Sequence, residues 1–361
     1  MGAAPAPRPP SSRSGRWRAL ALLCLAPLCL GASCVKGIAG DGMRWRLFSA
    51  YGVPQMCPEL LSRGVPLSLT PNGNTVGRFF PSRCSHQVNA ATRTVVLHFG
   101  GTGYTWTPVG GRVGFSADAS VEYAMDWKAA KHRTTYVWGR FARMVAPPTF
   151  QLGGVENKAV SWAAHETPLG YVAATFGQQL GAGQLAQGFT VIHHPRRGDD
   201  FSLGILYPPQ VPVRPFDTTV GRRLVCANET TEVHVQQVDF LGPFAVVKQD
   251  QSLFLRLQVR SGPGVEVLVL EQTSADPWRE SLQLGAALGP PPVAPVASFA
   301  VPAGLEQRQR LKLAPGRYYV VIDNSTKLGA VAPPWNPLTP LGANAAVVAV
   351  AVELGDDRDR Q

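Results

Sequence analysis

Short runs of apolar and β-branched residues, broken by turn residues, recur along most of the chain and are typical of β-strands. Residues 94–99 form one such run, and a glycine-rich turn at 100–103 follows them. Similar runs recur at spacings of roughly ten residues up to residue 138. A hairpin pattern covers 189–206. We therefore predict an antiparallel, barrel-like meander in the first half.

One segment of this half has the period of a helix. Thr167 and Pro168 suit a helix cap and first turn, and apolar residues follow at 169, 172, 173, 176 and 180. These positions share one helical face, so we predict a helix near 167–180, limited by the glycines that follow. Residues 35–92 are rich in Gly and Pro and predict irregular structure.

The second half has a strict period of two. Residues 252–259 and 265–270 alternate in this way, and further strand patterns extend to residue 354. Such strands suit two packed sheets whose inner faces bury every second residue. A proline-rich stretch at 208–215 precedes them. We predict a β-rich domain over 34–215, a β-sandwich over 222–354, and a charged tail at 355–361.

The start of the chain has the layout of a secretory signal. Four arginines precede an apolar run at 19–30, and the small residues 31–33 follow. The run is shorter than the roughly 20 residues that span a bilayer. We predict that 1–33 is a signal peptide, and that the protein faces the periplasm or the exterior.

The residue after this segment is Cys34, and the sequence around it resembles a bacterial lipoprotein signal, in which the cysteine becomes lipid-modified. Gly31 departs from that pattern, which favours an aliphatic residue three positions before the cysteine. A secreted protein cleaved near residue 32 or 33 is the alternative. The resemblance implies a membrane anchor through Cys34.

The net positive charge of the chain is smaller once this segment is removed. The full sequence has a net charge of +10, and four of these charges lie in residues 1–33, which contain no acid. The remaining basic residues are scattered, and no nucleic-acid reader motif occurs. We therefore expect no nucleic-acid partner, although mild positive charge could attract anionic lipid or glycan surfaces.

The cysteines divide in the same way. Two lie in the signal, and Cys34, Cys57, Cys84 and Cys226 remain. Cys57 and Cys84 are close in sequence, so an oxidising compartment favours a disulfide between them. If Cys34 carries lipid, Cys226 is left as a buried thiol; otherwise three pairings remain open.

Two resemblances concern the mature chain. Residues 315–323 (PGRYYVVID) resemble one strand and its turn in pre-peptidase-type β-sandwich modules. Residues 77–84, 113–116, 188–192 and 239–244 resemble segments of uncharacterised predicted envelope lipoproteins of high-GC Gram-negative bacteria. The first resemblance implies a sandwich, and the second implies a location in the cell envelope without a known activity.

The sequence contains no common catalytic or metal-binding motif. It lacks a G-x-S-x-G elbow, a phosphate-binding loop, H-E-x-x-H and C-x-x-C. We predict no catalytic residues, metal site or cofactor, and a binding or structural role. A hydrolase of unfamiliar spacing is one alternative, and it would need a cleft that gathers His98, His193 and a carboxylate.

Aromatic residues concentrate in the predicted meander. Tyr104, Trp106, Tyr123 and Trp138 are the candidates for a stacking surface or an apolar lining. Core filling is the favoured explanation, because Trp and Tyr are large apolar side chains. A second alternative function is therefore a lipid or glycan carrier with an aromatic-lined pocket in the N-terminal half.

Overall fold

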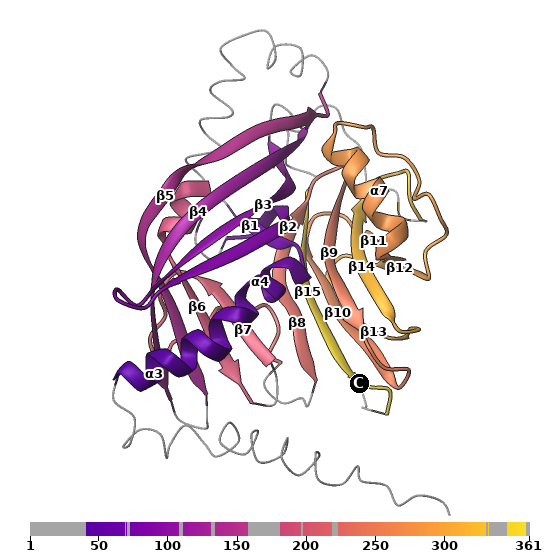
Figure 1. The fold of residues 1–361 in the computed structure, drawn as a ribbon. Coiled ribbons are helices and arrows are strands. Elements are labelled where there is room, and N and C mark those ends of the chain that lie inside the picture. Colours follow the sequence, from indigo (N-terminus) through magenta and orange to yellow (C-terminus); the bar gives the residue numbers. More distant parts are fainter. Residues whose placement is uncertain are drawn as a thin grey trace, which may run out of the picture.

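The computed structural model describes residues 41–68, 70, 73–107, 111–130, 134–157, 181–195, 198–218, 223–329, 331 and 345–358. The predicted signal peptide, Cys34 and the predicted helix near 167–180 lie outside the described residues. Within them the chain is mainly β, as the sequence predicts (Figure 1).

The described chain begins with helical segments that the sequence analysis did not predict. These are α3 (Asp41–Leu47), a π-helical turn η1 (Phe48–Gly52) and α4 (Val53–Ser62). Pro54 stands in the first turn of α4, where a missing N–H costs nothing, and Pro58 lies inside it. Trp45 and Val53 pack against β3 and β4. The expectation of irregular structure over 35–92 is therefore wrong for these residues.

The same expectation is wrong for residues 75–89, which form a long strand. An antiparallel meander follows from it, as the sequence predicts. Its strands are β1 (Val65–Ser68), β2 (Thr75–Asn89), β3 (Thr94–Thr107), β4 (Gly111–Ala129), β5 (Thr135–Val155), β6 (Phe189–His194) and β7 (Gly198–Leu203). In Figure 1 these strands form a strongly curved sheet on one side of the molecule.

A disulfide ties the helical segment to this sheet. Cys57 of α4 and Cys84 of β2 are bonded, with Cα atoms 5.4 Å apart. The predicted pairing is confirmed. Cys226 is partly buried and forms no disulfide, and burial raises the pKa of its thiol to about 11.

The second half is a two-sheet sandwich. Its elements are β8 (Leu224–Val233), β9 (Gln237–Val246), β10 (Gln251–Ser261), β11 (Val265–Glu271), α7 (Gln272–Gln283), β12 (Ala297–Val301), β13 (Glu306–Lys312), β14 (Gly316–Asn324) and β15 (Ala346–Asp356). One sheet has the order β12-β11-β14-β9, and β13-β10-β15-β8 face it. The predicted sandwich is confirmed.

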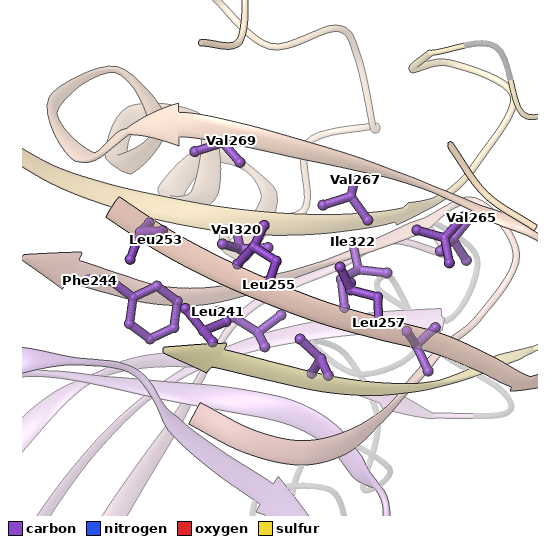
Figure 2. Packing of buried hydrophobic residues seen from close by; sticks show 14 of the residues in the cluster. Leu241, Phe244, Leu253, Leu255, Leu257, Val265, Val267, Val269, Val320 and Ile322 are labelled. Carbon is purple, nitrogen blue, oxygen red and sulfur yellow. The ribbon is translucent and has the colours of Figure 1, made fainter. Parts of the chain in front are cut away.

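The sandwich core follows from the period-two pattern. Leu253, Leu255 and Leu257 of β10 point into the space between the sheets, where Val267 and Ile322 meet them (Figure 2). All five side chains are almost fully buried. Burial of a side chain of this size contributes about 1.5–3 kcal/mol, so these positions anchor the second half.

The two halves share one sheet. β8 of the sandwich lies beside β2 of the meander, in parallel, through the single pair Thr75–Thr231. The sheet therefore runs from β13 to β7 without a break. The C-terminal end of α7 also contacts the first half of the chain. Arg112 of β4 donates to the carbonyl of Leu282 in α7 at 3.1 Å and to that of Ala286, just after the helix, at 2.8 Å. The division into two domains stays a prediction.

No helix in the described part of the chain is long and apolar enough to cross a membrane.

Candidate functional site

A cavity of about 640 Å³ lies at the junction of the two halves. β1, the helical turn at 181–186, β7, the segment 212–215 and β8 surround it. Hydroxyl and amide side chains dominate its polar lining: Ser68, Thr70, Asn74, Thr75, Gln184, Gln187, Ser202 and Thr230. Small-molecule sites usually measure about 300–1,000 Å³, so the cavity can hold a ligand.

The cavity exists because β7 and β8 approach each other without pairing. β7 pairs only with β6, and β8 continues the sheet on the other side through β2. The chain connects the two strands through 208–215, which contains four prolines and no strand. Proline has no N–H to donate to a ladder. The segment therefore crosses the seam without closing it.

Arg214 fixes this connecting segment at the cavity wall. Its guanidinium donates to the Asp200 carboxylate and to the Phe201 carbonyl of β7, the latter at 2.6 Å. It also lies 3.4 Å from the carbonyl of Asn228 on β8. Arg260 donates to the carbonyl of Pro215 at 3.0 Å. Both arginines that line the cavity are thus engaged in holding its wall.

Glu229 connects the cavity to a buried charge network. Glu229 lines the cavity, and its carboxylate pairs with Arg78 of β2, which is 2% exposed. Arg78 also binds Asp239 of β9 through two hydrogen bonds of 2.8 Å. The hydroxyls of Tyr104 and Thr231 each donate to Asp239 at 2.8 Å. The network therefore joins β2, β3, β8 and β9 at the point where the halves meet.

The electrostatics of Asp239 follow from these contacts. Burial alone would raise the pKa of this carboxyl, but the charge of Arg78 and the hydrogen bonds from Arg78, Tyr104 and Thr231 outweigh it. The net result is a lowered pKa, so Asp239 is ionised at neutral pH. A fully paired carboxylate of this kind holds structure together and is a poor proton acceptor.

A second polar group lies beside this network. Trp106 stacks on His234, with ring centroids 3.3 Å apart and planes 3° apart. The Nε2 atom of His234 is 3.0 Å from the Glu232 carboxylate. The space between these residues and Arg112 is only about 20 Å³, which is enough for one water molecule. This pocket cannot accept a ligand.

The structure does not bring the four candidate stacking residues together. Tyr104 is buried in the charge network, and Trp106 stacks on His234. Tyr123 is 3% exposed and packs edge-on against Phe189. Trp138 is also buried, on the other face of the sheet. None of these rings lines the large cavity.

The two histidines of the hydrolase alternative also lie apart. His98 bonds to Ser120 of β4 through Nδ1 at 2.8 Å. His193 lies on β6 and contacts Asp199 across the exposed hairpin at 2.6 Å. Through the pairing of β6 with β5 and of β5 with β4, His193 lies level with a position on β4 that is nine residues from Ser120. Nine residues span about 30 Å at the rise of a strand. No cleft in the described part of the chain gathers both.

The charge network and the cavity were not predicted from the sequence. A signal existed, because Arg78 and Asp239 are single charges inside apolar runs (VGRFF and VDFLG). Charged residues in such positions are rarely buried unless they are paired. Arg78 and Asp239 are 161 residues apart in sequence, so only the folded structure shows that they pair with each other.

Comparisons with known proteins add no identification. No protein-family model matches the chain, and no curated protein matches it. Among solved structures, two of an exo-β-1,3-galactanase from Phanerochaete chrysosporium are similar, one with galactotriose and one with galactose. They are 10% and 9% identical, cover 80% of this chain and 84% of theirs, and have TM-scores of 0.17 and 0.16. Values this low carry no argument about fold or function.

Proposed function

We propose that this chain is an exported, lipid-anchored protein of the cell envelope that binds a small ligand in the junction cavity without transforming it. The observation that carries the proposal is the cavity itself, with a volume of about 640 Å³ and a lining rich in hydroxyl and amide groups. Export rests on the signal pattern of residues 1–33 and on Cys34. The Cys57–Cys84 disulfide fits an oxidising compartment.

The chemistry of the lining favours a neutral polar ligand. Two of the three charged residues at the cavity are paired with an opposite charge, Glu229 with Arg78 and Arg214 with Asp200, and Arg260 donates to the Pro215 carbonyl. Serine, threonine, asparagine and glutamine can donate and accept hydrogen bonds with a neutral hydroxyl-rich molecule. Phe201, 38% exposed, adds an aromatic surface to the lining. A saccharide has both the hydroxyls and the apolar ring face that such a lining recognises.

The ligand is tested by calorimetric titration of the purified protein with a panel of neutral oligosaccharides that covers the main linkage types. At least one is expected to bind, and Phe201→Ala is expected to weaken binding about tenfold, the loss of roughly 1.4 kcal/mol of contact energy. Tyr207→Ala is the matched control, since Tyr207 is 49% exposed and does not line the cavity. Absence of binding to the whole panel, or equal binding by the Phe201 variant, contradicts the proposed site.

The anchor is tested separately. Metabolic labelling with a fatty acid, followed by membrane fractionation, is expected to show lipid on the wild-type protein and none on Cys34→Ala. The Cys226→Ser variant is the control, because it removes another thiol without touching the signal. If Cys34→Ala stays equally membrane-associated, the anchor assignment fails; a wild-type protein that carries no lipid label and is found in the soluble fraction would instead support the secreted alternative.

A further inference from the structure

An exposed apolar face lies on the first helical segment of the described chain. Met43 and Leu47 of α3 and Tyr51 of η1 are 57%, 45% and 61% exposed. They follow one another at intervals of four residues, a spacing that places side chains on one face of a helix. Single exposed apolar side chains are ordinary, but a contiguous group marks a contact with another surface. None of the three residues lines the junction cavity.

The opposite face of the same segment is packed against the meander. Trp45 and Val53 are buried in a cluster with residues of β3 and β4, and Phe48 packs against that cluster. The Cys57–Cys84 disulfide holds the end of the segment on β2. Figure 1 shows α3 at the periphery of the molecule. The segment therefore cannot turn its exposed side chains inward without breaking these contacts.

The length of chain before α3 indicates what this face meets. Asp41, the first residue of α3, is seven positions after Cys34, the residue that carries the lipid in the proposed function. An extended chain spans at most about 3.3–3.6 Å per residue, so α3 begins within about 25 Å of an anchored Cys34. A tether this short gives the exposed face a high effective concentration at the bilayer surface.

The residues of the segment suit the boundary between water and lipid. Residues 35–46 contain three basic residues and one acid, and Arg46, next to Leu47 in the sequence, is exposed. Basic residues near a membrane are attracted to anionic headgroups. Tyrosine is enriched where membranes meet water, because its ring is apolar and its hydroxyl is polar. Met43 and Leu47 supply the apolar surface that such a helix places at the acyl boundary.

We propose that Met43, Leu47 and Tyr51 form a face that lies against an anionic lipid bilayer and orients the protein on it. The inference rests on the lipid anchor of the proposed function, which brings this face to the membrane. The contact fixes the helical segment relative to the bilayer and, through the disulfide, fixes the meander as well. A flexible tether alone would leave the protein free to rotate above the membrane.

The test attaches the mature chain to vesicles chemically, so that it does not depend on lipidation in the cell. In a Cys226→Ser background Cys34 is the only free thiol of the mature chain, because Cys57 and Cys84 are bonded to each other. Cys34 is coupled to a maleimide lipid in vesicles of phosphatidylcholine and phosphatidylglycerol. Oxidation of Met43 by hydrogen peroxide, measured by peptide mass spectrometry, then reports the exposure of this face.

Coupling is expected to slow the oxidation of Met43 at least about fivefold relative to uncoupled protein with the same vesicles, because the bilayer covers the side chain. Leu47→Ser/Tyr51→Ser is expected to lose most of this protection, since less apolar area enters the bilayer. The control is Val247→Ser/Leu305→Ser, which removes apolar side chains that are 71% and 64% exposed in loops of the sandwich. It is expected to be protected like the parent protein. Circular dichroism establishes that each variant is folded.

Equal oxidation of Met43 in coupled and uncoupled parent protein would show that the face does not meet the bilayer, and the proposal would be wrong. It would also be wrong if Leu47→Ser/Tyr51→Ser were protected as well as the parent protein, because proximity to the vesicle would then explain the protection. Equal protection on vesicles of phosphatidylcholine alone would contradict the contribution of charge.

A second copy of the chain is the other occupant that the test examines. If the uncoupled parent protein dimerises in analytical ultracentrifugation and Leu47→Ser/Tyr51→Ser does not, the face joins two copies and the lipid assignment is wrong. Absence of lipid on Cys34 in the metabolic labelling experiment would overturn the anchor, whereas the oxidation of Met43 reports on the face itself.

Discussion

Replacement of Arg78 by methionine tests the role of the junction network most directly. Methionine keeps a long side chain but removes the guanidinium, which makes two 2.8 Å hydrogen bonds to Asp239 and a further ion pair with Glu229. Asp239, which is 4% exposed, would then be a buried anion without a counter-charge. Removal of one partner of a buried pair costs about 3–5 kcal/mol. We expect Arg78→Met to reduce the free energy of unfolding by this amount at pH 7.

The pH dependence gives a second, independent check. In the wild type the pKa of Asp239 is lowered, so its contribution is present above the unfolded value of about 3.9 and is lost as pH falls through the folded value. In Arg78→Met only the hydrogen bonds from Tyr104 and Thr231 still oppose the effect of burial, and we expect the pKa of Asp239 to rise above its unfolded value. The folded variant then binds a proton more tightly than the unfolded chain does. The deficit of the variant is therefore expected to be smaller at pH 5 than at pH 7.

Urea unfolding followed by tryptophan fluorescence at both pH values measures these effects. Arg83→Met is the matched control, because Arg83 lies on the same strand and pairs with Asp118 on the surface, where the two side chains are 67% and 47% exposed. Such exposed pairs contribute about 0–1 kcal/mol. If Arg78→Met and Arg83→Met have equal effects, or if the Arg78 deficit does not change with pH, the network does not stabilise the junction as described.

Two further predictions concern the contacts between elements. The double variant Cys57→Ser/Cys84→Ser removes a cross-link over 27 residues, and we expect it to lower the free energy of unfolding by about 3–4 kcal/mol in the chain-entropy model; an unchanged urea midpoint would contradict this. Gly114→Ala would place a Cβ 1.7 Å from the Gln283 carbonyl of α7. We therefore expect the free energy of unfolding, measured by thermal unfolding, to fall by at least about 1–3 kcal/mol. Gly183→Ala, whose Cβ meets nothing within 4 Å, serves as its control and should be neutral or slightly stabilising.

The strands with a regular period were the most predictable part of the molecule. Residues 252–259 lie in β10 and 265–270 in β11, because every second side chain is buried between two sheets and the sequence must alternate. α4 was missed because Pro54 and Pro58 suggested a loop, although proline is tolerated in a first turn. Local sequence pattern predicts strands well. It is a poor predictor of short helices that are held in place by tertiary packing.

The site was less predictable because it depends on pairing between distant segments. Period-two spacing correctly implies that Tyr104 and Trp106 share one face of β3, and both line the same small pocket. It does not say which face is buried, so the aromatics could not be assigned to core or surface. The large cavity arises from the absence of pairing between β7 and β8, a property of the sheet order that no residue pattern encodes.

The position of β15 has a consequence for how the protein reaches its native state. This strand lies between β8 and β10. Its first residue, Ala346, pairs with Val233 of β8, which is more than a hundred residues earlier in the sequence, roughly the length of a small domain. β8 and β10 cannot complete their backbone hydrogen bonds until residues 346–356 have been synthesised and have inserted between them. Because such long-range pairing is slow, β8 and β10 present open edges in the meantime. These open edges can pair with other chains until residues 346–356 are in place.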